Sequence, residues 1–210
     1  MASDGRRYGG LLIDYGGVLT TDLFDSFGAF CRNEGLSADA IGERLRHDPN
    51  CRELLIAIET GRLPEPEFES RFAAILGVRA PQLIDRMFAG SRPDPAMAAA
   101  VRALHEGGIR TGLLSNSWGT RRYDRALLDS AFDTVVISGE EGIRKPTPSI
   151  YSLAAERIGL PPERCVFVDD LPFNLTPAAE LGMATIHHVR TEETIAELER
   201  LFGLAGLISG

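Results

Sequence analysis

Short apolar runs alternate with longer amphipathic stretches along most of this chain, and no other sequence feature constrains its fold as strongly. Strands of low polarity that alternate with helices are typical of a parallel sheet covered by helices on both faces. We therefore predict an α/β fold with a doubly wound parallel sheet. The strand-length runs are residues 11–13, 109–114, 135–137, 166–168 and 184–187. The helical patterns between and after them are residues 97–105, 121–128, 149–158, 177–181 and 193–201.

Residues 21–91 interrupt this alternation, because they contain helical patterns but no convincing strand. Gly61 follows the third of these patterns, where a left-handed helix end favours glycine. Phe24, Phe27 and Phe30 lie at helical spacing and are expected in the core of a helical bundle. We predict a core of residues 1–20 and 92–210 and an inserted helical cap of residues 21–91, which covers the strand ends as a lid. The helical patterns are residues 24–33, 38–46, 52–60, 65–76 and 81–88.

Charge and cysteine content narrow the class of protein. The chain carries 30 acidic and 22 basic residues, a net charge of −8, and repulsion disfavours nucleic acid and anionic membrane surfaces as partners. Its apolar runs of about six residues are much shorter than the ~20 that a membrane span requires. The scattered cysteines Cys31, Cys51 and Cys165 suggest neither a disulfide framework nor a zinc site. These features predict a soluble protein of the cytoplasm.

Polar groups follow the apolar runs at the positions where the strands of the predicted sheet end. Ligands of such sheets bind at the carboxyl ends of the strands. Asp14 follows the first run, Ser115 follows the second, and the pair Asp169 and Asp170 follows the fourth. The sheet therefore brings a carboxylate, a hydroxyl and a carboxylate pair to one edge. Lys145 lies in a loop that follows the third run by a few residues.

Each of these groups also has a structural explanation. Ser115 and the pair Asp169 and Asp170 could cap the helices that follow them. Lys145 could be a solvated surface lysine next to a turn. However, two adjacent aspartates at the end of a buried strand would repel each other unless a cation lies between them. The occurrence of all these groups together, in this order, favours a functional site.

Four motifs follow one another along the chain. They are D-Y-G-G-V-L-T from residue 14, L-L-S-N-S-W from residue 113, R-K-P-T-P-S-I-Y from residue 144 and F-V-D-D-L-P-F-N from residue 167. These motifs resemble those of the haloacid dehalogenase (HAD) superfamily and occur in the same order. The resemblance covers essentially the whole chain and implies a Rossmann-like core with an all-helical cap inserted after the first motif. The fourth motif most resembles the phosphatase domain of soluble epoxide hydrolases and an α-glucose-1-phosphatase group.

The resemblance implies a phosphatase-type hydrolase of small phosphorylated metabolites. In that family pattern Asp14 is the nucleophile and forms an aspartyl-phosphate, which splits one difficult displacement into two easier ones. Mg²⁺ is the implied cofactor, and hard oxygen atoms are its usual ligands. The pattern assigns Asp14 and Asp170 as direct carboxylate ligands, Asp169 as a ligand through water, and the backbone carbonyl of Gly16 as a further ligand.

The remaining implied residues bind or orient the substrate. Lys145 would neutralise the nucleophile and the phosphoryl oxygens, and the Ser115 hydroxyl with an amide at Asn116 would hold one of those oxygens. Trp118 could form a wall of the pocket over a substrate, or it could be ordinary packing. Asn174 could position Asp170 or the substrate, or it could cap a helix.

Gly16 departs from the superfamily pattern. Phosphatases of the superfamily usually carry an aspartate here, which protonates the leaving group and then activates water. A positioned general acid or base typically contributes about 10²–10⁴-fold. We therefore expect an impaired or altered enzyme that favours substrates whose leaving group departs unprotonated, such as acyl or aryl phosphates. Asp22, Asp25 or His47 on the cap side could supply a substitute acid.

Two other functions fit the same sequence. A haloacid dehalogenase also uses an aspartate nucleophile and a lysine and needs no protonated leaving group, but it uses no Mg²⁺ and has little use for the aspartate pair. A non-catalytic protein that binds a phosphorylated ligand would also have no need of the acid. A dinucleotide-binding protein is disfavoured, because neither G-x-G-x-x-G nor G-x-x-x-x-G-K-[ST] occurs in the chain.

Overall fold

The computed structural model of the protein describes residues 6–204, and the predicted core residues 1–5 and 205–210 lie outside that range. Within it, five strands form one parallel sheet in the order β3–β2–β1–β4–β5. The predicted doubly wound parallel sheet is therefore confirmed, with β1 at its centre. The strands are β1 (Gly10–Ile13), β2 (Arg110–Ser115), β3 (Thr134–Ile137), β4 (Cys165–Asp169) and β5 (Ala184–His187).

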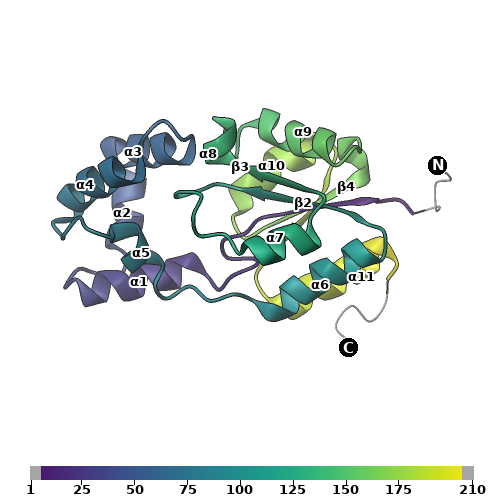
Figure 1. The fold of residues 1–210 in the computed structure, drawn as a ribbon, viewed down its shortest axis with the longest axis horizontal. Coiled ribbons are helices and arrows are strands. Elements are labelled where there is room, and N and C mark those ends of the chain that lie inside the picture. The colour runs from purple at the N-terminus through teal and green to yellow at the C-terminus, as the bar shows by residue number, and fades with distance from the viewer. Residues whose placement is uncertain (1–5, 205–210) are drawn as a thin grey trace.

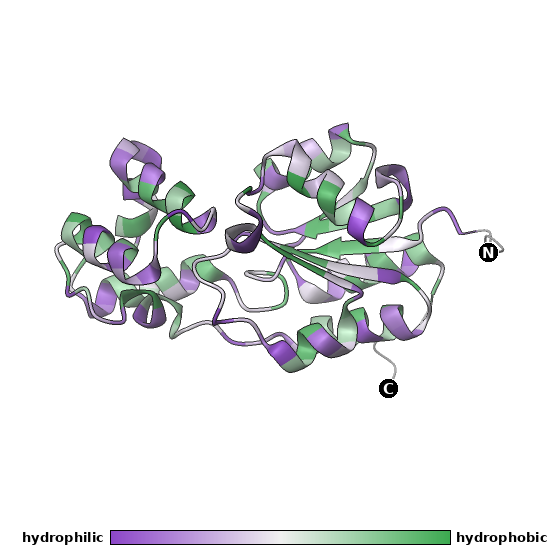
Figure 2. Ribbon diagram, turned by 45° about the horizontal axis from the view of Figure 1, so that its top comes forward, coloured by the Kyte–Doolittle hydropathy of each residue, from purple (hydrophilic) through white to green (hydrophobic). Residues whose placement is uncertain are grey.

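Helices bury both faces of the sheet, because successive side chains of a strand point to opposite sides. Leu11 and Ile13 of β1 pack into one apolar cluster with α6, α7 and α11, whereas Leu12 packs into another with α9 and α10. Figure 1 shows these helices on opposite sides of the sheet, and Figure 2 shows the apolar strands between them. The helices are α6 (Pro95–Glu106), α7 (Arg125–Ala131), α9 (Pro148–Arg157), α10 (Pro172–Glu180) and α11 (Thr191–Phe202).

Two of these helices differ in extent from the sequence prediction. The pattern over residues 121–128 becomes helical only at Arg125, because the side chain of Asp124 accepts a backbone hydrogen bond and caps the first turn there. The short pattern over residues 177–181 is the end of the longer helix α10. The structure adds a four-residue helix, α8 (Ser138–Glu141), and a 3-10 turn, η1 (Pro162–Arg164).

The chain between β1 and α6 forms a second group of helices with an apolar core of its own, beyond one end of the sheet (Figure 1). Phe27 and Phe30 are buried in this core as predicted, but 52% of Phe24 is exposed, so its predicted place in the core is wrong. Gly61 follows α3 with a φ of +67°, the left-handed conformation expected of it. The helices are α1 (Leu23–Asn33), α2 (Ala40–His47), α3 (Pro49–Glu59), α4 (Glu65–Leu76) and α5 (Leu83–Phe88).

The helical group meets the rest of the protein at close range. Its two connections lie side by side, because Thr20 and Pro93 form an isolated antiparallel bridge. At Gly61, a Cβ would lie 2.2 Å from the carbonyl oxygen of Gly139, so only glycine permits this approach of the two backbones. The bridge lies next to the predicted domain boundaries after residue 20 and before residue 92, and the division itself stays a prediction.

The cysteines are buried free thiols. Burial raises the pKa of the Cys51 thiol to about 11 and that of Cys165 to about 12. Both therefore stay protonated and pack as small apolar side chains. Across residues 6–204, no helix combines the length and apolar character that crossing a membrane demands.

Candidate active site

A buried lysine joins two of the predicted carboxylates at the carboxyl edge of the sheet. Asp14 directly follows β1, and Asp169 is the last residue of the neighbouring strand β4. Lys145 Nζ lies 3.0 Å from Asp14 Oδ1 and 2.6 Å from Asp169 Oδ2. Lys145 and Asp169 are completely buried, whereas Asp14 is 8% exposed. Asp14 is therefore the member of this group that a ligand can reach.

Burial and the neighbouring charges have opposite effects on the pKa values of the residues in this group. Burial, opposed by Lys145 and aided by Asp169, raises the pKa of Asp14 to about 6. Burial also disfavours the ammonium charge of Lys145, but the two carboxylates outweigh it and raise the pKa of that lysine. Lys145 is consequently a cation at neutral pH, placed beside the carboxylate that would have to attack an anionic substrate.

Asn116 holds the backbone of the loop that carries this lysine. The Lys145 amide donates to Asn116 Oδ1 at 2.9 Å, and Asn116 Nδ2 donates to the Lys145 carbonyl at 3.0 Å. The side chain of Asn116 is thus engaged in positioning Lys145. The predicted contact of Asn116 with a phosphoryl oxygen would therefore be made by its backbone amide.

Asp14, Asp169 and Asp170 form the acidic cluster that the sequence predicts to hold Mg²⁺. Each offers one carboxylate oxygen, and these oxygens all lie within 4.8 Å of one another. Burial, with repulsion from Asp14 and Asp169, raises the pKa of Asp170 to about 7. Asp170 Oδ1 is buried without a hydrogen-bond partner, which costs free energy unless another group binds it. A hard divalent cation would satisfy that oxygen and offset the repulsion, so the residues present fit Mg²⁺.

The loop after β1 brings its backbone against Asp170. Gly17 has a φ of +77°, and a Cβ at this residue would lie 2.4 Å from Asp170 Oδ2. Glycine is therefore required here both for the left-handed backbone and for the close approach. Gly16, whose carbonyl is the further predicted metal ligand, belongs to the same loop and lines the same cavity as Asp14 and Asp170.

Asn174 hydrogen-bonds Asp169, the neighbour of Asp170, which is the aspartate that the sequence suggested it would position. Asn174 is buried, and its Nδ2 lies 3.0 Å from Oδ1 and 3.1 Å from Oδ2 of Asp169. The Leu171 amide donates to Asp169 Oδ1 at 2.9 Å, so Asp169 is surrounded by donors, including the Lys145 ammonium. Asn174 therefore orients Asp169, and its predicted contact with substrate stays a prediction.

Ser115 ends β2 and is held by a tyrosine that sequence reasoning missed. The Tyr123 hydroxyl donates to Ser115 Oγ at 3.1 Å, and burial raises the pKa of this phenol, so it remains a donor. Ser115 Oγ lies 3.5 Å from the Asn116 carbonyl, which is long for a hydrogen bond. The proton of Ser115 is thus available to a phosphoryl oxygen.

A cavity of about 750 Å³ lies between this edge of the sheet and the helical group, lined by residues of both. Trp118 is one of them. Its ring also packs against Phe27 and Phe68, with centroid distances of 5.4 and 5.5 Å. Trp118 therefore packs against the apolar core of the helical group and lines the cavity, and its predicted contact with a substrate stays a prediction.

The space beside Gly16 is filled by an apolar side chain. A Cβ on residue 16 would lie 2.6 Å from Leu23 Cδ1, at the start of α1. An aspartate at this position would therefore require Leu23 to move. Phe24 and Phe173 line the same cavity and are 52% and 56% exposed. The position beside Gly16 is thus occupied by an apolar side chain, and two phenylalanine rings are exposed in the same cavity.

Glu59 is a buried carboxyl in the cavity that sequence reasoning missed. It is the last residue of α3 and is 5% exposed. Its Oε2 lies 2.5 Å from Arg144 Nε. Burial, opposed by Arg144, Lys145 and a hydrogen bond from Trp118, raises the pKa of Glu59 to about 7. In the sequence it is an unremarkable glutamate near a helix end, and only the fold brings it to this place.

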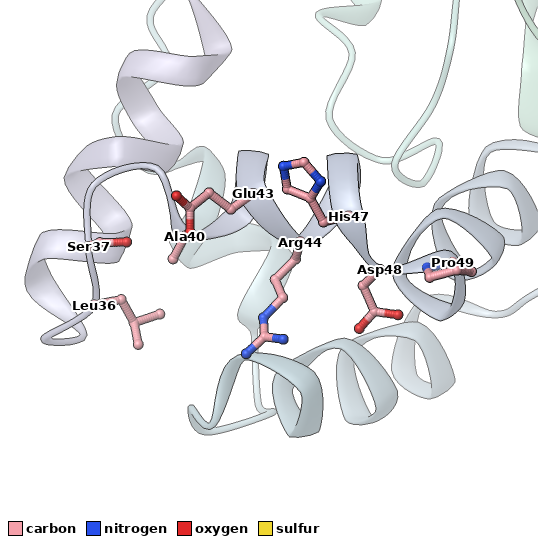
Figure 3. Close-up of a pocket in the computed structure, with 8 residues that line it drawn as sticks. All are labelled: Leu36, Ser37, Ala40, Glu43, Arg44, His47, Asp48 and Pro49. Carbon is pink, nitrogen blue, oxygen red and sulfur yellow. The ribbon is translucent and has the colours of Figure 1, made fainter.

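The three predicted substitutes for the missing acid lie outside this cavity. Asp22 caps α1 by accepting a hydrogen bond from the Phe24 amide at 2.7 Å, and Asp25 lies in the exposed first turn of that helix. His47 lines a different hollow of about 670 Å³ on the helical group (Figure 3). Their placement lends no support to a role in proton transfer at Asp14.

The doubly wound sheet and the charged residues at its carboxyl edge together place this chain among the hydrolases built on such a sheet. Its sequence matches the haloacid dehalogenase-like hydrolase family over residues 8–182. The chain belongs to this family, as the motifs predict.

Curated relatives include phosphatases. "Acyl-CoA dehydrogenase family member 10" of Mus musculus is 40% identical over 111 residues, which cover 52% of this chain and 10% of that protein. "Bifunctional epoxide hydrolase 2" of Sus scrofa is 30% identical over 141 residues, 61% of this chain and 25% of that protein. "Glyceraldehyde 3-phosphate phosphatase" of Methanopyrus kandleri is 30% identical over 136 residues, covering 63% and 55%. The matched regions thus span from a tenth to about half of these relatives.

Solved structures share the fold. A HAD family enzyme from Bacteroides thetaiotaomicron superposes with a TM-score of 0.70 at 22% identity, over 92% of this chain and 98% of that one. The wild-type form of that enzyme in complex with magnesium and inorganic phosphate superposes with a TM-score of 0.62 at 24% identity, over 85% and 93%. This likeness shows that the chain has the HAD-like α/β fold.

Proposed function

We propose that this chain is a Mg²⁺-dependent phosphatase that hydrolyses small phosphorylated metabolites through an aspartyl-phosphate on Asp14. The observation that carries the proposal is the position of Asp14, which is slightly exposed in the cavity, paired with Lys145 at 3.0 Å and clustered with Asp169 and Asp170. Phosphatase relatives, and a similar fold that binds magnesium and phosphate, support the same chemistry.

In the proposed reaction Asp14 attacks phosphorus while the bond to the leaving oxygen breaks, and that oxygen takes the electron pair. Water then attacks the phosphorus, frees the carboxylate and releases inorganic phosphate, so that one water is consumed for each substrate. Lys145 offsets the repulsion between two anions, and the Ser115 hydroxyl and Asn116 amide hold a phosphoryl oxygen. Most of the rate enhancement comes from positioning and electrostatic stabilisation.

The acidic cluster would hold the metal through the carboxylates of Asp14 and Asp170 and the Gly16 carbonyl, with Asp169 acting through water. When bound, Mg²⁺ supplies positive charge that stabilises the phosphoryl group as negative charge develops on it. Lys145 and Asn174 keep Asp169 oriented for this role through their contacts of 2.6 to 3.1 Å with its carboxylate.

The cavity and the charge of the chain indicate the class of substrate. A volume of about 750 Å³ suits a small metabolite, and a net charge of −8 makes nucleic acid and anionic membranes poor partners. Gly16 carries no acid at the usual position next to the nucleophile, and Leu23 fills the space beside it. The proton transfer to the leaving group is therefore altered. We place the protein in the cytoplasm, where a reducing environment keeps its cysteines as thiols.

The proposal is tested with p-nitrophenyl phosphate as the substrate. We expect turnover that requires Mg²⁺, is abolished by a chelator, and falls at least about 10³-fold in Asp14→Asn, because that variant lacks the nucleophile. Asp25→Asn is the matched control, since Asp25 is an exposed aspartate outside the cavity, and its turnover should equal that of the wild type.

Three results would contradict the proposed phosphatase function. Equal rates in wild type and Asp14→Asn would remove the nucleophile from the mechanism. Release of chloride from a 2-chloroacid in the presence of the chelator would favour the dehalogenase. Binding of inorganic phosphate without an aspartyl-phosphate mimic forming on Asp14 in beryllium fluoride would favour a non-catalytic binding protein.

A further inference from the structure

The proposed phosphatase still requires a proton donor on the leaving-group side. Gly16 removes the usual carboxyl, and Leu23 occupies the space beside it. In phosphoryl transfer the attacking and leaving oxygens lie roughly in line with phosphorus. Because Asp14 attacks from the edge of the sheet, the leaving oxygen points away from the sheet and toward the helical group. A substitute acid is therefore to be sought on that side of the cavity.

The acidic residues that line the cavity within residues 6–204 leave one candidate. Asp14 is the proposed nucleophile, and Asp170 belongs to the proposed metal site. Asp85 has a 45% exposed side chain and forms an ion pair of 2.6 Å with Arg122. No histidine of the described residues lines the cavity. Glu59 remains, and it is the one whose side chain comes from the helical group and is buried.

Glu59 is held from several directions. Its backbone carbonyl accepts a hydrogen bond from Ser138 Oγ at 2.5 Å, which fixes the end of α3 against α8. Its carboxylate oxygen Oε2 is fully buried and lies 2.5 Å from Arg144 Nε, so Arg144 is its charged partner. Lys145 follows Arg144 directly, so the pair lies one residue from the catalytic lysine.

We propose that Glu59 is the general acid and base of this enzyme and replaces the aspartate that is absent at residue 16; the inference rests on the proposed phosphatase function. In the first step the Glu59 carboxyl gives its proton to the leaving oxygen as the bond from that oxygen to phosphorus breaks. In the second step the Glu59 carboxylate takes a proton from the water that attacks the phosphorus of phospho-Asp14. The proton that Glu59 loses is thereby restored, and alcohol and inorganic phosphate leave.

The electrostatics of the site suit both steps. The pKa of Glu59 is raised to about 7, because burial and the negative charge of Asp14 together outweigh the lowering by Arg144, Lys145 and Trp118. An acid and base works best when its pKa lies near the working pH, because both protonation states are then populated. Arg144 also stabilises the carboxylate that remains after the proton has been given to the leaving group.

The test is the dependence of Glu59→Gln on the leaving group. Benzyl phosphate needs protonation of its leaving oxygen, whereas p-nitrophenyl phosphate releases a stable phenolate without it. In Glu59→Gln we expect kcat/KM for benzyl phosphate to fall about 10²–10⁴-fold, and kcat/KM for p-nitrophenyl phosphate to stay within about tenfold of the wild type. The second substrate should also give a burst of one p-nitrophenolate per chain, because water attack on phospho-Asp14 is slowed.

Glu53→Gln is the matched control, because Glu53 is an exposed glutamate of the same helix. It should leave both substrates unchanged. If Glu59→Gln fails to fold, Glu59→Asp keeps the charge beside Arg144 and only withdraws the carboxyl by one methylene. It should show the same selective loss for benzyl phosphate.

A rescue variant separates proton transfer from packing. Adding Gly16→Asp and Leu23→Ala to Glu59→Gln places a carboxyl at the usual position and clears the space that Leu23 fills. We expect it to regain at least about tenfold in kcat/KM for benzyl phosphate, a result that repair of a purely structural contact would not give.

An equal loss for both substrates without a burst would overturn the role of Glu59 and leave it a structural partner of Arg144. Wild-type turnover that depends on Asp14, together with an unaffected Glu59→Gln, would overturn this inference alone. Absence of any Asp14-dependent turnover in the wild type would overturn the proposed function and this inference with it.

Discussion

The floor of the proposed active-site cavity is charged and paired, whereas its roof is largely apolar. The floor consists of Asp14, Lys145, Asp169 and Asp170 at the carboxyl edge of the sheet, where Lys145 lies within 3.0 Å of two carboxylates. The roof is the side of the cavity that the helical group contributes. Its apolar residues are Leu23, Phe24, Phe27, Leu45, Leu55 and Phe88. The roof also contributes the charged residues Arg46, Glu59 and Asp85, and of these three only Glu59 is buried.

This difference separates two kinds of constraint. A floor residue is fixed by the others, because an unpaired buried charge is costly and every member needs its partners. An apolar roof residue mainly excludes water and contacts the part of the substrate that leaves. We therefore expect changes in the floor to alter stability and turnover together, and changes in the apolar residues of the roof to alter substrate preference and affinity.

The largest expected effect comes from removing the cation of the floor. Lys145→Met leaves Asp14 and Asp169 buried without their shared partner. We expect the free energy of unfolding to fall by about 3–5 kcal/mol and kcat for p-nitrophenyl phosphate to fall by at least about 10²–10³-fold. Urea unfolding and steady-state kinetics measure the two effects.

Arg157→Met is the matched control for this variant. Arg157 forms a 2.6 Å ion pair with Glu141 and its side chain is 37% exposed. Removing an exposed pair of this kind should cost about 1 kcal/mol or less and leave turnover unchanged. If Lys145→Met were as stable and active as this control, the floor would not depend on its cation.

The residues of the floor could be predicted from the sequence, because their chemical type and their position after the strands both point to the same edge of the sheet. Carboxylates directly after apolar runs must meet at one edge of a parallel sheet, so the sequence alone was enough to bring Asp14, Asp169 and Asp170 together. The sequence holds one further signal for the floor. Lys145 is the only lysine among the 22 lysine and arginine residues of the chain. Its ammonium is a compact point charge that contacts both buried carboxylates, at 3.0 Å from Asp14 and 2.6 Å from Asp169.

A pH-dependent effect of intermediate size is expected from Asp170. Burial and neighbouring aspartates raise its pKa from an ordinary value near 3.8 to about 7 in the folded protein. Between about pH 4 and 7 the folded state therefore binds a proton that the unfolded chain does not, and stability falls as the pH rises through this window. Without metal, Asp170→Asn should be more stable than the wild type at pH 8, by at least about 1 kcal/mol or 2–4 °C in Tm.

The same variants should change order when the metal is added. Thermal unfolding at pH 8 with a chelator should favour Asp170→Asn, whereas saturating Mg²⁺ should raise the Tm of the wild type more than that of the variant. At pH 4 the two proteins should differ little, because Asp170 is then protonated in the folded state. A wild type as stable as Asp170→Asn at pH 8 without metal would show that Asp170 is not held in a repulsive cluster.

The residues of the roof were harder to predict from the sequence, because a helical pattern does not indicate which face of a helix lines a cavity. The spacing of Phe24, Phe27 and Phe30 predicts one buried stripe, yet Phe24 lines the cavity and is half exposed. Leu23 filling the place of the missing acid, and Glu59 lying beside Arg144, both depend on how the helical group docks on the sheet. Such contacts join distant parts of the chain and leave no local signal in the sequence.

The smallest expected effect comes from this exposed phenylalanine and tests the roof directly. Phe24→Ser should raise KM for naphthyl phosphate about fivefold, which corresponds to losing about 1 kcal/mol of apolar contact, part of the value of a fully buried side chain. KM for acetyl phosphate and kcat for both substrates should stay unchanged, because the floor is intact. Ile56→Ser is the matched control, since Ile56 is an exposed apolar residue of the same helical group that does not line the cavity. A drop in kcat in Phe24→Ser without a change in KM would mean that the apolar residues of the roof also act on the transition state, and the division between the floor and the apolar roof would then be wrong.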